Sequence, residues 1–356
     1  MMRSFGRKLV AIAMVFIFSG AVWAQQKDEP IKLESTLVLV DAIALSRKTN
    51  TVVGDLKRDD FRIEEDSKRQ EITHFSREEL PLSVVLLVDI SQSMNPIIDE
   101  LQRTALEALG RLKPEDKVAL MVFANKSRLV SDLTTQHESI AEKLGNLWNE
   151  SGNVGYATFI NLAIYNAARY LRAKTEPTER RAIVMITDDV DTNCANLGPT
   201  RDAVERELFE TGTTLCAITV GAEGAGRKAV RAGVTAAVAI ASPGLGAAII
   251  ASRLLHRFSP TRGSAKHYAE RTGGVAVNAK RDEVAVHFAG LLELLRTRYT
   301  FGYAPADTAR DGRFRAIKVT VSDKAKKEKG DMRILARRGY YIRKEFDPRT
   351  YRVKSN

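Results

Sequence analysis

The central part of the chain alternates short apolar runs with amphipathic segments. The apolar runs are Leu82–Val88, Val118–Phe123, Ala182–Thr187, Thr213–Val220 and Val275–Val277. Continuous apolar runs of this length are typical of strands that are buried on both faces of a parallel sheet. Between them, apolar residues recur at helical spacing, as at Ile97, Leu101, Ala105 and Leu109. The pattern predicts an α/β fold with a doubly wound, mostly parallel sheet that is covered by helices on both faces.

The two flanks of this region show the strand period of two. Leu and Val dominate Ile31–Leu45, and Tyr299, Phe301 and Tyr303 alternate with other residues, so we expect these aromatic rings in a core. We expect a hairpin with strands at Phe61–Ile63 and Ile72–Phe75 and a turn between them, and a second, charged hairpin tip at 324–329. Each flank is too small for a core alone. They are predicted to pair into one small β domain that carries the α/β domain as an insertion; two separate β appendages are the alternative.

These patterns divide the chain into segments. We expect a signal peptide at 1–24, a β flank at 25–80, the α/β domain at 81–296, a second β flank at 297–345 and a tail at 346–356. The first segment has basic residues before the apolar run Leu9–Val22 and a small-x-small site that ends at Ala24. Cleavage after Ala24 predicts a periplasmic or secreted protein. An uncleaved anchor is the alternative, but the apolar run is short for a membrane span.

An uncharged stretch lies inside the expected α/β domain. Ala232–Ser252 contains no charged residue and is long enough to cross a bilayer as a helix. However, it lies between two strands of one sheet, and Pro243-Gly244 interrupts it. We therefore expect a helical insertion at about 223–263 that packs on the domain, and no membrane span after signal cleavage. An apolar lip beside the ligand-binding edge is an open functional alternative.

Charge and cysteine content narrow the function classes. The formal net charge is +11, but Lys and Arg are spread along the chain among Asp and Glu. Nucleic-acid binding would favour a concentrated basic stripe or a known module, and neither is present, so no nucleic-acid partner is expected. Cys216 lies inside the predicted strand Thr213–Val220, whereas Cys194 lies in a loop beyond the opposite end of the neighbouring strand. Because a disulfide needs the two Cα atoms close together, we expect both cysteines to be free thiols.

Oxygen-bearing side chains follow two of the predicted strands. Asp89, Ser91 and Ser93 form a D-x-S-x-S pattern directly after the first apolar run, Thr158 precedes a predicted helix, and Asp188 follows the run that ends at Thr187. Ligands of open α/β sheets bind at the carboxyl ends of the strands. Carboxylate and hydroxyl oxygens favour hard cations, so the set predicts a Mg²⁺ or Mn²⁺ site. The alternative is that these side chains hydrogen-bond the loop backbone.

The order of these motifs resembles the von Willebrand factor type A domain and its metal-ion-dependent adhesion site, over Pro81 to about Arg296. The flanks, with Asp60-Phe61 before it and Arg338-Gly339-Tyr340 after it, are similar to the exported "VWFA-related" proteins of Acidobacteria. The resemblance implies that the two serines and Thr158 contact the ion directly or nearly so, with Asp89 and Asp188 held partly through water. An open coordination position would then take an Asp or Glu carboxylate of a partner protein.

The sequence therefore predicts an exported, non-enzymatic, metal-dependent adhesion module, with no catalytic residues. The alternative is a metal-independent envelope assembly or scaffold protein that uses its β flanks or the 232–252 insertion. A two-metal hydrolase built on Asp188, Asp189 and Asp191 ranks third, because the five histidines are scattered. We expect Asp189 and Asp191 to be solvated loop acids. The pattern leaves the oligomeric state open.

Overall fold

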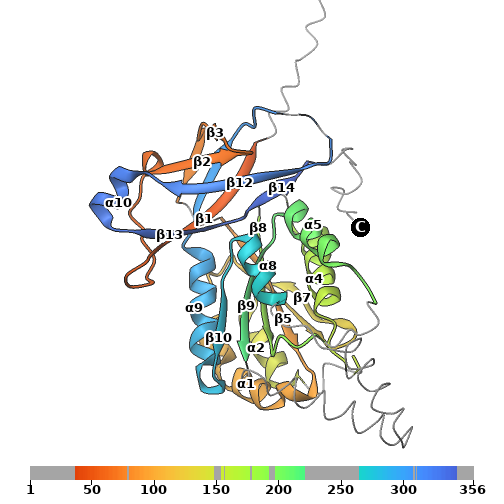
Figure 1. Ribbon diagram of the computed structural model, residues 1–356. Coiled ribbons are helices and arrows are strands. Elements are labelled where there is room, and N and C mark those ends of the chain that lie inside the picture. Colours follow the sequence, from red (N-terminus) through yellow and green to blue (C-terminus); the bar gives the residue numbers. More distant parts are fainter. Residues whose placement is uncertain are drawn as a thin grey trace, which may run out of the picture. The chain divides into compact units, whose positions relative to one another are not determined.

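The computed structural model describes residues 37–77, 80–147, 154–155, 157–176, 179–191, 197–220, 264–307, 309 and 311–342 (Figure 1). The expected signal peptide, the 223–263 insertion and the 346–356 tail lie outside the described residues, as does Cys194. No helix in the described part is both long enough and apolar enough to cross a membrane.

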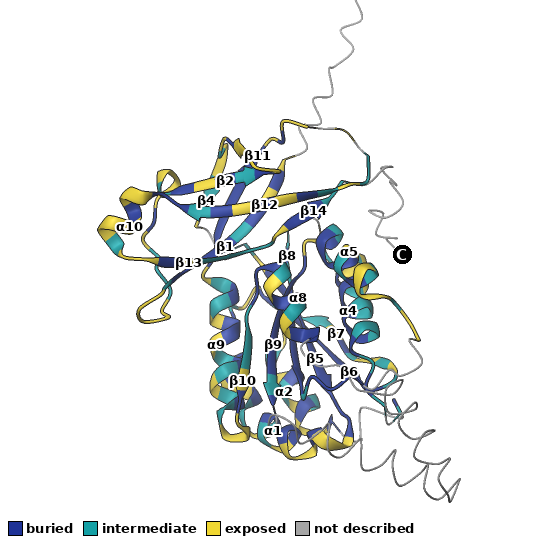
Figure 2. Ribbon diagram, viewed as in Figure 1, coloured by how far each residue is buried: buried dark blue, intermediate teal, exposed yellow. Residues whose placement is uncertain are grey.

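A six-stranded sheet in the order β10-β9-β8-β5-β6-β7 forms the centre of the α/β region. Its parallel strands are β5 (Leu82–Asp89), β6 (Lys117–Phe123), β8 (Arg180–Thr187), β9 (Thr214–Val220) and β10 (Ala276–Ala279). The edge strand β7 (Ser127–Thr134) runs antiparallel to β6 and is largely polar, so the apolar pattern did not predict it. The burial of β5 on both faces confirms the predicted buried parallel sheet (Figure 2).

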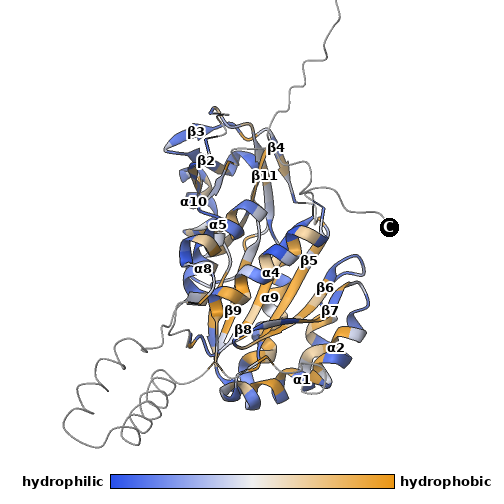
Figure 3. Cartoon of the chain, turned by 90° about the vertical axis from the view of Figure 1, so that its right-hand side faces the viewer, coloured by the Kyte–Doolittle hydropathy of each residue, from blue (hydrophilic) through white to orange (hydrophobic). Residues whose placement is uncertain are grey.

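Helices cover both faces of this sheet, as predicted. One core forms with α1 (Asn95–Leu109), α2 (His137–Gly145) and α9 (Val284–Arg296). The other forms with α4 (Ile160–Lys174), α5 (Arg201–Thr211) and α8 (Ser264–Thr272). Figure 3 shows the apolar strands between the helices. Short 3-10 helices, η2 (Gln92–Met94) and η3 (Arg281–Glu283), precede α1 and α9.

The two flanks pair with each other into two further sheets. One has the order β13-β1-β11-β4 and the other β14-β12-β2-β3. The strands from the first flank are β1 (Val38–Ser46), β2 (Phe61–Glu65), β3 (Lys68–Gln70) and β4 (His74–Ser76), with η1 (Arg58–Asp60) before β2. Those from the second are β11 (Tyr299–Tyr303), β12 (Phe314–Val321), β13 (Met332–Ala336) and β14 (Gly339–Tyr341). The β1–β11 and β2–β12 pairs confirm one shared β unit and exclude two separate appendages.

The core of this β unit contains the three aromatic residues that were expected there. Tyr299, Phe301 and Tyr303 are buried, and the rings of Phe61 and Phe301 lie 4.7 Å apart between centroids. Edge-on packing of such rings adds to the apolar burial that stabilises the unit.

Two local predictions in the flanks were wrong. Residues 324–329 do not form a hairpin tip, because the Ser322 hydroxyl accepts a hydrogen bond from the Ala325 N–H and begins a short helix, α10 (Asp323–Lys329). The hairpin partner of β2 is β3, not 72–75. Asp66 and Ser67 both adopt positive φ and make a tight turn, so the chain returns at once. The later segment β4 joins the other sheet.

Candidate metal centre

The first loop of the candidate site is held by a buried carboxylate at the end of β5. Asp89 is 0% exposed. One of its oxygens, Oδ1, accepts the Ser91 N–H at 2.9 Å, and the other, Oδ2, accepts the Thr187 hydroxyl at 2.7 Å. The Ile90 N–H donates to the Phe123 carbonyl of β6 at 3.0 Å. Asp89 thus fixes the loop that follows β5 to the end of β8.

A row of oxygens continues outward from this anchor. The hydroxyls of Ser91 and Ser93 lie 3.2 Å apart, and the Ser93 hydroxyl donates to Asp188 Oδ2 at 2.7 Å. The other oxygen of Asp188 accepts the Val190 N–H at 3.0 Å. Ser91 is buried while Ser93 is exposed, so the row runs from the interior to the surface. Four of the five predicted ligands are therefore brought together.

Thr158, the fifth predicted ligand, lies at the same edge of the sheet. It is 4% exposed and lies two residues before Ile160, the first residue of α4. The next residue, Phe159, donates its N–H to the Ala124 carbonyl at 2.9 Å, and Ala124 directly follows β6. Since Phe123 is the register partner of Asp89, this bond ties the Thr158 loop to the strand beside Asp89.

The two carboxylates of the site influence each other. Burial raises the pKa of Asp89 to about 7, and the nearby charge of Asp188 adds to the rise. The Ser91 N–H and the Thr187 hydroxyl act in the opposite direction because they stabilise the ionised form. Neither Asp89 nor Asp188 forms an ion pair with any Lys or Arg among the described residues. In the described part of the chain, the site therefore has two carboxylates and no side-chain cation paired with them.

The donor set fits a hard divalent cation. Every candidate ligand presents oxygen, and two of the neighbouring groups are neutral hydroxyls. Within the part of the chain that the structure describes, no group of three or more His, Cys, Asp or Glu side chains could hold a metal ion. Carboxylates alone therefore do not make this site, and an ion held here would depend on Ser91, Ser93 and Thr158.

Asp189 and Asp191 are not the solvated acids that we expected, since they are 7% and 9% exposed. Asp189 adopts a left-handed φ of 54°. Its N–H donates to the Thr187 hydroxyl at 3.0 Å, and its Oδ1 accepts the Ala265 N–H at 3.1 Å near the start of α8. Asp189 therefore fastens the second loop to a helix. The sequence patterns did not predict that Asp189 holds this loop or that Thr187 bonds to Asp89. A Thr at the end of an apolar run could have indicated the second contact.

The protein is thus a doubly wound α/β domain with hydroxyl and carboxylate oxygens clustered at the carboxyl ends of its strands, where such domains bind ligands. Residues 84–190 match the family model of the von Willebrand factor type A domain. The chain therefore contains a von Willebrand factor type A domain, as the resemblance predicted. The narrower likeness to the exported proteins of Acidobacteria stays a prediction.

Several solved structures are similar to this chain at low identity. BatB from Bacteroides thetaiotaomicron is 19% identical, with 60% of this chain and 98% of that chain covered and a TM-score of 0.41. Proximal thread matrix protein 1 from the mussel byssus, with a zinc occupied MIDAS motif, is 14% identical over 65% and 49%, at 0.39. A von Willebrand factor type A protein from Catenulispora acidiphila is 10% identical over 82% and 74%, at 0.44. No curated protein matches the sequence.

Proposed function

We propose that this protein is an adhesion module that binds a partner protein through a divalent cation, Mg²⁺ or Mn²⁺. Asp89, Ser91, Ser93, Thr158 and Asp188 would hold the ion. The observation that carries the proposal is the row of oxygens from Ser91 through Ser93 to Asp188, with successive separations of 3.2 and 2.7 Å, at an edge that is open at Ser93.

The charge balance of these residues favours an acidic ligand. When bound, the ion supplies a Lewis acid that accepts a further oxygen ligand. The serine hydroxyls and Thr158 carry no formal charge and donate little electron density, so the cation would remain a strong Lewis acid even with Asp89 and Asp188 beside it. Asp89 is buried and hydrogen-bonded on both oxygens, which suits it to positioning the Ser91 backbone. A carboxylate of a partner protein would complete the coordination.

The proposal includes export and excludes catalysis. Export rests on the basic and apolar pattern before Ala24, which favours a periplasmic or secreted protein. Binding of a carboxylate to an open coordination position requires no activated nucleophile or general base, so the proposed site has no catalytic residue.

The test is affinity capture from an extract of the source cells with the full chain as bait. Capture is compared in MgCl₂, in EDTA, and in MgCl₂ with Asp188→Ala. Asp282→Ala is the matched control, because Asp282 lies in η3, is exposed and forms no ion pair with the described residues. We expect a partner that the wild type and Asp282→Ala retain in MgCl₂ and that both EDTA and Asp188→Ala release.

Retention of the partner in all conditions would contradict the proposal. It would favour the alternative function, a metal-independent scaffold protein, in which the β flanks or the 232–252 insertion make the contacts. The paired flanks support this second candidate because they form a unit with its own aromatic core.

A further inference from the structure

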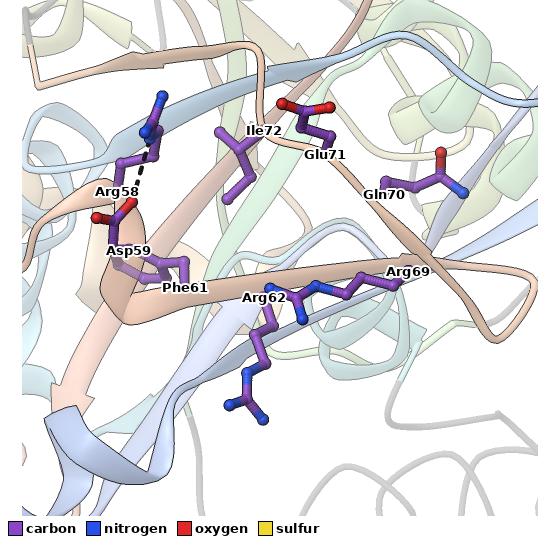
Figure 4. Close-up of a pocket in the computed structure, with 8 residues that line it drawn as sticks. All are labelled: Arg58, Asp59, Phe61, Arg62, Arg69, Gln70, Glu71 and Ile72. Atoms are coloured by element: carbon purple, nitrogen blue, oxygen red, sulfur yellow. Dashed lines mark hydrogen bonds and ion pairs between the residues drawn. The ribbon is translucent and has the colours of Figure 1, made fainter.

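A recess of about 480 Å³ lies at the open end of the β2–β3 hairpin, away from the turn at Asp66 and Ser67 (Figure 4). The pairing of the two strands ends at Ile63 and Gln70, whereas β2 continues to Phe61 and remains paired with β12 on its other side. The chain after Gln70 leaves for the other sheet, where it becomes β4. The recess is the space that opens between residues 58–62 and 69–72 as these segments separate.

The recess has an apolar floor and a charged rim. Phe61 is 3% exposed, Gln70 is 8% exposed, and Ile72 is half-buried against the aromatic core of the β unit. The charged residues of the rim are all exposed: Arg58, Asp59, Arg62, Arg69 and Glu71. The volume lies within the range of sites for small organic ligands, and the lining is mainly polar, with Phe61 and Ile72 as its apolar residues.

Two guanidinium groups of the rim have no ion-pair or side-chain hydrogen-bond partner among the described residues. Arg58 pairs with Asp59 at 3.3 Å. Arg62 and Arg69 form no ion pair or side-chain hydrogen bond with any described residue. Figure 4 shows the guanidinium group of Arg69 pointing along β2 toward Arg62. Three guanidinium groups and the two carboxylates of Asp59 and Glu71 leave one positive charge in excess.

The nearest acid on the same strand does not supply the missing charge. Glu64 lies opposite Arg69 in the β2–β3 register and two residues from Arg62. Its carboxylate is instead 3.8 Å from the Lys318 ammonium of β12. The like charges of Arg62 and Arg69 therefore line the recess without an ion-pair partner among the described residues.

We propose that this recess binds an organic anion. Arg62 and Arg69 would hold its oxyanion, a carboxylate or a phosphate, because the planar guanidinium fork matches both groups. The apolar body of the ligand would lie against Phe61 and Ile72. The site belongs to the β unit and uses none of the residues of the cation site, so it is an additional binding activity that does not depend on the proposed adhesion function.

The experiment is a calorimetric titration of the full chain after a chelating resin has removed divalent cations, which excludes cation-mediated binding without adding a competing carboxylate. Phenyl phosphate and benzoate are the probes, and inorganic phosphate and phenol test charge alone and the aromatic ring alone. The main variant is the double substitution Arg62→Gln/Arg69→Gln. Arg128→Gln is the matched control, since Arg128 on β7 is exposed and forms no ion pair with the described residues.

We expect at least one of the two organic anions to bind the wild type and Arg128→Gln equally. The double variant should bind it at least about tenfold more weakly, as expected for loss of charge-assisted hydrogen bonds. The stronger of the two probes identifies the preferred oxyanion. Ile72→Ala should weaken the binding of either probe, and thermal unfolding of this variant checks that it is folded at the temperature of the titration.

Three results would overturn the proposal. They are unchanged affinity in the double variant, inorganic phosphate binding as tightly as phenyl phosphate, and no binding of either organic anion. Because the protein is free of divalent cations throughout, none of these results bears on the adhesion proposal. Conversely, loss of partner capture in Asp188→Ala leaves the anion site intact.

Discussion

The charged residues at the amino ends of the parallel strands have different partners from those at the carboxyl ends. At the amino edge, Glu179 lies 3.2 Å from the Lys117 ammonium and accepts the Ser83 hydroxyl at 2.6 Å, and Arg180 lies 3.4 Å from Asp41. At the carboxyl edge, Asp89 and Asp188 have only hydroxyl and N–H partners and no ion pair among the described residues. Among the described residues, the charges are paired at the amino ends of the strands, whereas Asp89 and Asp188 at the carboxyl ends have no ion pair.

The pKa values of the two edges reflect this difference. Burial raises the pKa of both Asp89 and Glu179. At Glu179 the Ser83 hydroxyl, the Glu176 N–H and Lys117 outweigh burial, so its pKa lies below the usual value. At Asp89 the neighbouring Asp188 adds to burial, and the pKa rises to about 7. Compensated charge indicates a structural role, whereas uncompensated charge that the fold holds in place indicates a site for an external cation.

The largest expected effect is at the amino edge. Arg180 is 7% exposed, pairs with Asp41 and donates to the carbonyls of Leu295 and Arg296 at the end of α9. Arg180→Met should lower the free energy of unfolding by about 3 kcal/mol, because it removes the buried cation that pairs with Asp41 and donates to the Leu295 and Arg296 carbonyls. Urea denaturation measures this loss. A change below about 1 kcal/mol would contradict a structural role for this edge.

A substitution at Asp89 tests the electrostatics of the carboxyl edge. The pKa of Asp89 is raised from 3.8 to about 7, so the folded protein keeps a proton that the unfolded chain releases. Stability in EDTA should therefore fall as the pH rises from about 4 to about 7.

Asp89→Asn keeps the shape and removes this titration, so it should gain stability relative to the wild type across the same window, by about 1–3 kcal/mol at the upper end. Urea unfolding at several pH values in EDTA gives the difference. Parallel curves for the two proteins would show that Asp89 is ionised throughout and would refute the expected repulsion from Asp188.

A smaller effect is expected from the exposed hydroxyl of the oxygen row. Ser93→Ala should weaken Mn²⁺ binding about tenfold, since groups that orient a metal ligand typically contribute this much. Its free energy of unfolding should change by less than about 0.5 kcal/mol because Ser93 is exposed. Electron paramagnetic resonance of free Mn²⁺ measures the affinity, with Ser139→Ala on α2 as the control. Equal affinities for the two variants would remove Ser93 from the site.

The smallest effect is expected for the partly exposed pair at the amino edge. The Lys117 side chain is 38% exposed, so Lys117→Gln should cost about 1 kcal/mol or less at pH 7. Glu179 keeps the Ser83 hydroxyl and the Glu176 N–H in this variant. Urea unfolding is again the measurement. A loss of unfolding free energy near that of Arg180→Met would show that the contributions of the two ion pairs do not depend on their burial.

The sheet and much of the candidate site were predictable because their signals are local. Long apolar runs predicted the parallel strands, and D-x-S-x-S after such a run predicted which oxygens meet Asp188. The edge strand β7 gave no such signal, since only one of its residues is fully buried. The helix α10 was missed because a charged run suits both a hairpin tip and a short helix, and the Ser322 cap decides between them.

Tertiary contacts decided the rest. Asp188 and Asp189 are adjacent and chemically identical, yet one faces the oxygen row and the other bonds to the backbone of α8. The left-handed φ of Asp189 separates the two directions, and sequence alone does not reveal it. In the same way, the departure of the chain after Gln70 creates the Arg62–Arg69 recess, because residues 72–75 do not continue the hairpin.

Binding of a divalent cation by the oxygen row is tested most directly by calorimetric titration of MgCl₂ into the wild type and Asp188→Asn at pH 8. Thermal unfolding of both proteins is measured in EDTA. We expect one Mg²⁺ per wild-type chain, an affinity at least about tenfold lower in Asp188→Asn, and an unfolding midpoint in EDTA that is unchanged or higher. Absence of Mg²⁺ and Mn²⁺ binding to the wild type, or equal affinity in the two proteins, would contradict it.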